Sequence, residues 1–232
     1  SEHVASRQHL GNVGPVAQEP HVHHHAQLFG QALERLADDA SNWRHTGREV
    51  WEATGRDGAA NGALMRCAPV ALRYLGDPER IRDVSIEQAW VTHFDPRCTW
   101  TCAALNLSID ALVRGERHDA SWHLIGDERV AALAAAAHER HTDEIRTSGY
   151  TMHCLEAAIW HLVNDATLEN ALVGVVNRGD DADTAGAITG ALAGARHGAA
   201  ALPSRWLDAL WVRDEAITLA DSLVDASLEA TP

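Results

Sequence analysis

The segment Gly179-Asp180-Asp181-Ala182-Asp183-Thr184 groups the side chains of this sequence that are best suited to chemistry. A single aspartate at the start of a helix is an ordinary cap, stabilised by free backbone N–H groups and the helix dipole. Three aspartates this close together repel one another, and the neighbouring sequence offers only Arg178 as a positive charge. A bound cation would relieve that repulsion.

We expect the carboxylates of Asp181 and Asp183 and the hydroxyl of Thr184 to share this cation. Residues two apart point to opposite sides of a regular helix, so the backbone must still be turning there, and Gly179 makes such a turn possible. Oxygen ligands suit Mg²⁺ or Mn²⁺ rather than Zn²⁺. Ordinary capping with solvated charge is the alternative.

Two further segments hold candidate binding residues. Asn61 and Gly62 open an apolar stretch and are typical of a helix entry, whose N–H groups can hold a phosphate or ribose oxygen or can simply be capped by the asparagine. Arg66 lies among apolar positions and is expected to meet a buried carboxylate. His93 ends one helical pattern just before Asp95, where a packing role is the ordinary interpretation.

The spacing of apolar residues predicts the helices that must position these groups. From residue 26 onward apolar side chains recur every three to four residues, and sustained strand-like alternation is absent. The predicted helices cover 79–92, 99–114, 128–140, 153–164 and 168–177, with breaks at Gly76-Asp77-Pro78, Asp95-Pro96, Gly115, Gly126-Asp127 and Ser148-Gly149. We therefore predict an all-α, single compact multi-helix domain of about eight to ten helices over residues 26–232.

Residues 1–25 are predicted to be an irregular N-terminal lead-in. They are polar, contain glycine and proline, and end in the histidine group His21-Val22-His23-His24-His25. This group is interpreted as a tag remnant, a capping segment or a chance cluster, with metal binding as the alternative.

Four glycines define one face of the helix that follows the aspartates. Gly186, Gly190, Gly194 and Gly198 recur every four residues. Each glycine costs about 1 kcal/mol relative to alanine inside a helix. We therefore expect another backbone to approach this face closely and the helix to be central.

Composition excludes several classes of function. Nineteen Lys and Arg against 33 Asp and Glu give a net charge of −14, which makes bulk binding to nucleic acid or anionic lipid unfavourable. No stretch reaches the ~18 apolar residues that a membrane span needs. The four cysteines form no zinc-binding pattern and suit a reducing compartment. A cytoplasmic protein is the resulting expectation.

Taken in order, these segments resemble the ADP-ribosylglycohydrolase family, which includes the dinitrogenase-reductase-activating glycohydrolases. The motifs that carry the resemblance are Asn61-Gly62-Ala63-Leu64-Met65-Arg66-x-x-Pro69, Thr92-His93-x-Asp95-Pro96, Gly149-Tyr150 with Leu155-Glu156-Ala157-Ala158, and Asn177-x-Gly179-Asp180-Asp181-Ala182-Asp183-Thr184-x-Gly186. Gly190, Gly194-Ala195-Arg196-His197-Gly198 and Pro203-x-x-Trp206 continue it. The resemblance covers residues 28–225.

The resemblance implies a metal-dependent hydrolase that removes ADP-ribose from a modified side chain or small acceptor, through an N- or O-glycosidic bond. It implies a binuclear Mg²⁺ or Mn²⁺ centre with Asp181, Asp183 and Thr184 as ligands. Its implied partner is an ADP-ribosylated protein or small molecule. Implied substrate contacts come from five residues, Asn61, Gly62, His93, Gly179 and Asp180.

The chain departs from the family pattern near its N-terminus. Family members carry a Thr-Asp-Asp-Thr segment that supplies other metal ligands and a catalytic carboxylate. This sequence does not reproduce that segment, since Ala37-Asp38-Asp39-Ala40 lacks both threonines. The catalytic residue therefore stays unassigned.

Three explanations of this departure remain open. The chain is a fragment of a longer enzyme, or a natural short member that acts as an ADP-ribose-binding or regulatory module, or residues 1–25 supply the ligands. A missing helical layer would also favour self-association.

Overall fold

The computed structural model describes residues 22–229, and within them it contains helices and turns but no strand. The eleven α-helices are α1 Val22–Asp38, α2 Trp43–Ala53, α3 Pro69–Arg73, α4 Pro78–Trp90, α5 Pro96–Val113, α6 Glu128–Ala136, α7 Thr151–Asn164, α8 Leu168–Val176, α9 Ala182–His197, α10 Ser204–Ala209 and α11 Arg213–Glu229. The predicted all-α class is confirmed. In this part of the chain no helix is both long and apolar enough to cross a bilayer.

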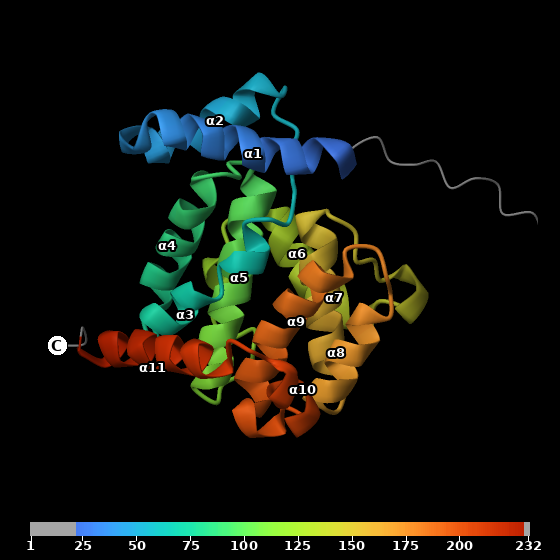
Figure 1. Cartoon of the computed structure of the whole chain (residues 1–232). Helices are drawn as coiled ribbons and strands as arrows, with labels where there is room; N and C mark the ends of the chain where they lie inside the picture. The colour runs from blue at the N-terminus through green and yellow to red at the C-terminus, as the bar shows by residue number, and fades with distance from the viewer. Residues whose placement is uncertain (1–21, 230–232) are drawn as a thin grey trace, which may run out of the picture.

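The longest buried helix, α5, lies in the middle of the bundle and packs against α4, α7 and α9 (Figure 1). Most of its residues are buried, which explains why apolar and small residues follow one another almost without interruption along it. The main core forms where α5, α7 and α9 meet, around Leu105, Leu155 and Ile188. This core fixes the helices whose ends carry the candidate site.

Aspartates at the predicted breaks start the helices as their sequence pattern indicates. Asp77 and Asp127 accept hydrogen bonds from N–H groups of the first turns of α4 and α6. Asp95 does the same for α5. Proline follows Asp77 and Asp95 at the first helical position, where its missing N–H costs nothing.

The first two helices form a hairpin that lies across one end of the bundle (Figure 1). α1 begins at Val22, so the predicted boundary at residue 25 falls inside a helix, and the division of the chain that it marks stays a prediction. Residues 1–21 lie outside the described residues, as do the side chains of the histidine group.

The helix α2 did not follow from the sequence pattern. Its buried face consists of Thr46, Gly47 and Val50, two of which are not apolar side chains. A small residue at position 47 is required because a Cβ there would lie 2.0 Å from the carbonyl oxygen of Trp90, at the end of α4. Close backbone contact at Gly47, rather than a full stripe of apolar side chains, therefore characterises the buried face of this helix.

The glycine face of α9 has a different cause from the one expected. A Cβ at Gly186 would lie 3.2 Å from Cγ2 of Val176, and one at Gly190 would lie 3.4 Å from Cδ2 of Leu172, so both glycines face side chains of α8. Gly194 has no heavy atom within 4 Å of its Cβ position, and Gly198 ends the helix with a φ of 75°. Close approach of another backbone is therefore not the reason for the pattern.

Gly194→Ala is expected to raise the free energy of unfolding by roughly 0.5–1 kcal/mol, because alanine loses less backbone entropy and meets no neighbour there. Urea denaturation at neutral pH measures this. Gly186→Ala is the matched control, and its crowding against Val176 should cancel the gain. A loss of stability at position 194 would show that another segment covers this face.

Candidate functional site

Asp181 occupies the N-cap position of α9, but its side chain makes no hydrogen bond to that helix. Its Oδ2 instead accepts a hydrogen bond of 2.6 Å from Nδ2 of Asn61, which is 120 residues away in the chain. The carboxylate therefore faces the Asn61 turn rather than the free N–H groups of its own helix. This geometry distinguishes Asp181 from the ordinary caps Asp77 and Asp127.

The backbone before Asp181 turns sharply, as the proposed sharing of a cation requires. Gly179 and Asp180 both have positive φ, 80° and 55°, which glycine adopts freely and aspartate more readily than most residues. Thr147 holds the turn from both sides, since its hydroxyl donates to the carbonyl of Gly179 at 2.9 Å and its own carbonyl accepts from the amide of Asp181 at 3.0 Å. Asp180 is exposed.

The Asn61 turn is held by the loop that precedes α7. The amide of Asn61 donates to the carbonyl of Gly149 at 3.1 Å, and Ala60 and Tyr150 form an isolated antiparallel bridge. On the other side, the thiol of Cys98 donates to the carbonyl of Ala60 at 3.2 Å. These contacts bring the Asn61 turn and the aspartate segment together across a large separation in sequence.

Cys154 contacts the side chain of Asn61. Its sulfur lies 3.2 Å from Nδ2 of Asn61 and accepts from it, while the thiol donates to the carbonyl of Ser148 at 3.1 Å. Burial raises the pKa of the Cys154 thiol to about 12, so the sulfur stays protonated and neutral. From the sequence the cysteines were considered only for zinc binding and redox compartment, and this contact was missed. The position of Cys154 one turn into a helix gave no signal of a polar partner.

Gly62 and His93 are in direct contact. A Cβ at Gly62 would lie 2.9 Å from Cε1 of the His93 imidazole, so only glycine leaves room for the ring. Nδ1 of His93 lies 2.7 Å from the hydroxyl oxygen of Thr92. Both His93 and Asn61 are buried, and the contact between His93 and Gly62 places two of the substrate-binding candidates side by side. Their contact with a substrate stays a prediction.

Among the described residues Arg66 meets no buried carboxylate, so that expectation was wrong. Its guanidinium donates to the carbonyl of Gly62 at 3.0 Å and to the hydroxyl of Thr92 at 2.6 Å. With these neutral acceptors, burial lowers the pKa of Arg66 from its ordinary value. The guanidinium joins the Gly62 turn to the end of α4, which is the scaffold role that its apolar surroundings indicate.

Arg178 is likewise not the counter-charge of the aspartates. Its Nε donates to Nε2 of His161 at 2.9 Å, and its Nη1 donates to the carbonyl of Thr142 at 2.8 Å. Nδ1 of His161 lies 2.6 Å from the carboxylate of Asp165. The repulsion between the neighbouring aspartates is therefore left without the compensation that the sequence had offered.

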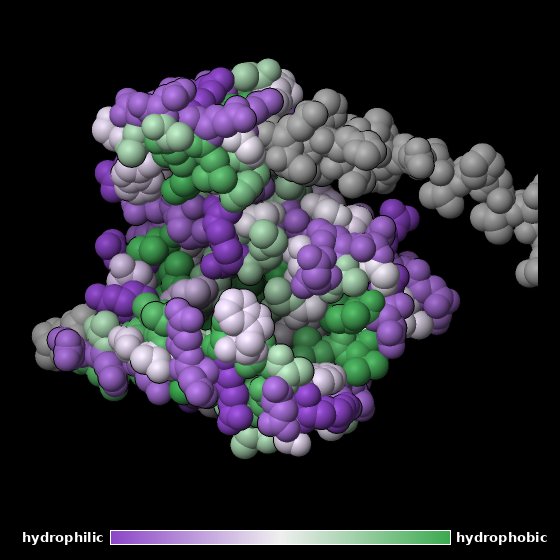
Figure 2. All heavy atoms as spheres, viewed as in Figure 1, coloured by the Kyte–Doolittle hydropathy of each residue, from purple (hydrophilic) through white to green (hydrophobic). Residues whose placement is uncertain are grey.

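The other two predicted metal ligands face different neighbours. Asp183 is exposed and lines a cavity of about 360 Å³ between α8 and α9, next to Val176 and Trp206. Figure 2 shows hydrophobic surface over α8, beside this cavity. Thr184 is buried, and its hydroxyl lies 3.7 Å from the sulfur of Met65.

The three predicted ligands have oxygen chemistry that suits a hydrated cation, but they face different neighbours in this structure. Asp181, Asp183 and Thr184 supply two carboxylates and a hydroxyl within one turn, and Mg²⁺ commonly takes one or two carboxylates and keeps several waters. However, among the side chains that the structure describes, no group of three or more His, Cys, Asp or Glu is arranged to hold a metal ion. The metal site and its number of ions therefore stay predictions.

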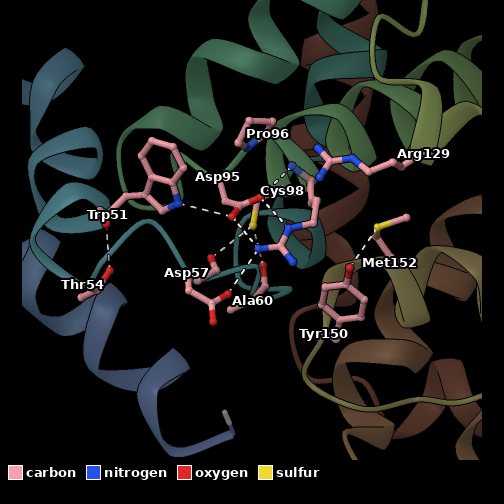
Figure 3. A network of polar contacts seen from close by, with 12 residues as sticks. Trp51, Thr54, Asp57, Ala60, Asp95, Pro96, Cys98, Arg129, Tyr150 and Met152 are labelled. Carbon is pink, nitrogen blue, oxygen red and sulfur yellow. Dashed lines mark hydrogen bonds and ion pairs between the residues drawn. The ribbon is translucent and has the colours of Figure 1, made fainter.

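Asp95, in the same motif as His93, has a structural partner. Burial alone would raise its pKa, but hydrogen bonds from Arg97, at 2.9 and 2.7 Å, and from the indole of Trp51, at 3.3 Å, keep the pKa below its ordinary value. Figure 3 shows Trp51, Asp57 and Asp95 around this network. It ties α2 to the start of α5 and so fixes the hairpin beside the candidate site.

Comparison with known proteins gives a consistent result. The family model described as ADP-ribosylglycohydrolase matches residues 9–231. An ADP-ribosylarginine hydrolase of Serratia proteamaculans is 31% identical over 196 residues, which is 83% of this chain and 52% of that protein. The ADP-ribosyl-[dinitrogen reductase] glycohydrolase of Rhodospirillum rubrum is 32% identical over 159 residues, 68% of this chain and 52% of that protein. The chain thus spans about half the length of these curated relatives.

A solved structure described as an ADP-ribosylglycohydrolase-related protein complex superimposes with a TM-score of 0.71 at 32% sequence identity. The match covers 86% of this chain and 69% of the other.

Proposed function

This chain belongs to the ADP-ribosylglycohydrolase family, and on that premise we propose that it takes part in the metal-dependent hydrolysis of an ADP-ribosyl bond. The name of the relative from Serratia proteamaculans makes ADP-ribosyl-arginine the first substrate to test. The observation that supports this is the contact between Asn61 and Asp181, which turns a carboxylate away from its own helix and toward the Asn61 turn.

We assign the roles of the residues as follows. Asn61 orients the carboxylate of Asp181 through the 2.6 Å hydrogen bond and leaves its Oδ1 for a ligand. Gly62 and His93 form a close-packed surface on which the nucleotide-sugar would lie, and Gly179 and Asp180 are the other proposed substrate contacts. The general acid or base is not assigned to any residue of this chain.

Mg²⁺ or Mn²⁺ held by Asp181, Asp183 and Thr184 would supply Lewis-acid polarisation when bound. The chain's own contribution is to orient Asp181 through Asn61 and to hold the turn at Gly179 through Thr147. For these three residues to share one ion, Asp183 must rotate from the α8 side toward Asp181.

Incubation of the purified protein with ADP-ribosyl-arginine tests the proposal. We expect ADP-ribose release, measured by chromatography, in the presence of Mn²⁺ or Mg²⁺, and none after chelation with EDTA. A full-length relative serves as the positive control, and Asp181→Asn as the matched negative control. Intact substrate with an excess of either metal, alongside an active relative, would refute hydrolysis.

A second candidate function is an ADP-ribose-binding or regulatory module without turnover. It is favoured by the finding that, among the described side chains, no group of three or more His, Cys, Asp or Glu is arranged to hold a metal ion. Calorimetry separates the two, because a binding module would take up ADP-ribose with a measurable heat and still leave the conjugate uncut. A protein that neither binds ADP-ribose nor cleaves the conjugate would contradict both functions.

A further inference from the structure

A second groove lies between α4 and the start of α5, outside the candidate site. It has a volume of about 490 Å³, enough for a large side chain. Three aromatic side chains, Trp90, Phe94 and Trp100, share its lining with the acidic residues Asp83 and Glu87. No role in the proposed hydrolysis uses this groove.

The aromatic rings are fixed by their neighbours. The rings of Trp90 and Phe94 lie 5.7 Å apart, centroid to centroid, and Phe94 contacts Trp51 at the same separation. The indole of Trp100 lies against Gly126, where a Cβ would come within 2.6 Å of Cη2. Because the rings are held in this way, a ligand would meet a preformed aromatic surface and would not have to order it.

The groove also carries an acidic group without a counter-charge. Glu87 is half-buried and, among the described residues, has no basic side chain within ion-pair distance. By contrast, Asp83 pairs with Arg82 at 2.7 Å. Arg80 also lines the groove, but its guanidinium lies over the ring of Tyr74, 5.5 Å from the centroid.

Flat aromatic faces beside a carboxylate match the guanidinium group of arginine. A guanidinium stacks on aromatic rings and pairs with carboxylates, and it carries less hydration than an ammonium group. The protein already uses this contact on Phe94, where Arg48 lies 5.9 Å from the ring centroid. The net charge of −14 further favours a cationic ligand.

We propose that the groove between α4 and α5 binds an arginine side chain of a partner protein, stacked on Trp90, Phe94 and Trp100 with its charge against Glu87. That this partner is the ADP-ribosylated substrate protein rests on the proposed function. Phe94 directly follows His93 in the chain, so an arginine held in the groove would anchor the partner next to the candidate site.

Titration with N-acetyl-arginine amide tests the groove independently of any hydrolysis. We expect saturable shifts of the indole N–H signals of Trp90 and Trp100 in NMR spectra of protein with ¹⁵N-labelled tryptophan. The neutral isostere N-acetyl-citrulline amide should bind at least about fivefold more weakly, because it lacks the charge. Equal binding of both probes, or the absence of a saturable shift, would overturn the proposal.

Glu87→Gln keeps the size of the side chain and is expected to weaken the arginine probe by about three- to tenfold. Glu79→Gln removes an exposed acid from the same helix, outside the groove, and is expected to leave the affinity unchanged. If both variants lose affinity equally, the effect is one of net charge, and the assigned contact is wrong. If lysine amide binds as tightly as the arginine probe, the guanidinium assignment is wrong.

The link to a substrate protein has its own readout. If the wild-type protein cleaves ADP-ribosyl-arginine, Glu87→Gln should raise KM for an ADP-ribosylated protein and leave KM for free ADP-ribosyl-arginine unchanged. An unchanged KM for both substrates would show that the groove does not dock the substrate protein. Absence of any hydrolysis by the wild-type protein would refute the proposed function and leave the binding result standing.

Discussion

Asn61→Asp is expected to lower the rate of ADP-ribose release by at least about 100-fold. The substitution replaces the donor that lies 2.6 Å from Oδ2 of Asp181 with a second carboxylate. Two carboxylates at that distance repel each other strongly in a partly buried site, so they share a proton or move apart. Either outcome removes the charge or the orientation that the proposed function assigns to Asp181. The loss is measured as kcat/KM on ADP-ribosyl-arginine, with far-UV circular dichroism to confirm folding.

The controls separate local repulsion from added charge. Asn170→Asp makes the same chemical change at an exposed position in the first turn of α8, and we expect wild-type activity from it. Asn61→Asp combined with Asp181→Asn restores a donor and an acceptor to the pair, and should recover stability without activity. Activity of Asn61→Asp within a few-fold of the wild-type rate would show that the amide does not position Asp181.

The helices that carry the site were predictable because each has a strong local signal. Asp77 and Asp127 combine a capping side chain with a helical apolar pattern, and both start helices at the predicted places. α5 is buried on nearly every side, so its almost continuous small and apolar sequence leaves few alternatives. Burial and capping are local properties of a segment, which is why the sequence alone indicates them.

The helices that the sequence did not predict lack such a signal. α11 is exposed along most of its length and is held against α3 by Arg73 and Ser227, whose hydrogen bonds go to backbone carbonyls. Its apolar residues follow no single stripe because little of the helix packs on the core. Contacts of this kind depend on the placement of a distant segment, which no local pattern reports.

The candidate site divides in the same way. The aspartate segment and the Asn61 turn were recognisable from residue type and spacing, and their proximity follows from the fold. The partner of Asp181 was not predictable, because the choice between Asn61 and its own helix N–H groups depends on the loop at Thr147 and Gly149. Arg66 and Arg178 show the converse. Apolar surroundings suggested a buried carboxylate partner for Arg66, and neighbouring aspartates suggested one for Arg178, but the fold supplies other acceptors to both.

Gly47 is the position where a single methyl group is expected to disturb the most structure. The α1–α2 hairpin depends on close packing of α2 against the end of α4. Trp51 of this hairpin donates a hydrogen bond to Asp95. The ring of Phe29, also in the hairpin, lies 6.3 Å from the ring of His93. Displacing the hairpin would therefore loosen one wall of the candidate site as well as the helix itself.

Gly47→Ala is expected to lower the free energy of unfolding by about 3 kcal/mol or more, because the added Cβ would lie 2.0 Å from the carbonyl oxygen of Trp90 and neither backbone can move away cheaply. Urea denaturation measures the loss, and the indole N–H signal of Trp51 in NMR spectra of protein with ¹⁵N-labelled tryptophan should change at lower urea than the signals of the core. Gly30→Ala on α1 is the matched control, since a Cβ there has no heavy atom within 4 Å, and it should be neutral or slightly stabilising. Equal midpoints for Gly47→Ala and the wild-type protein would mean that α2 does not pack against α4 in solution.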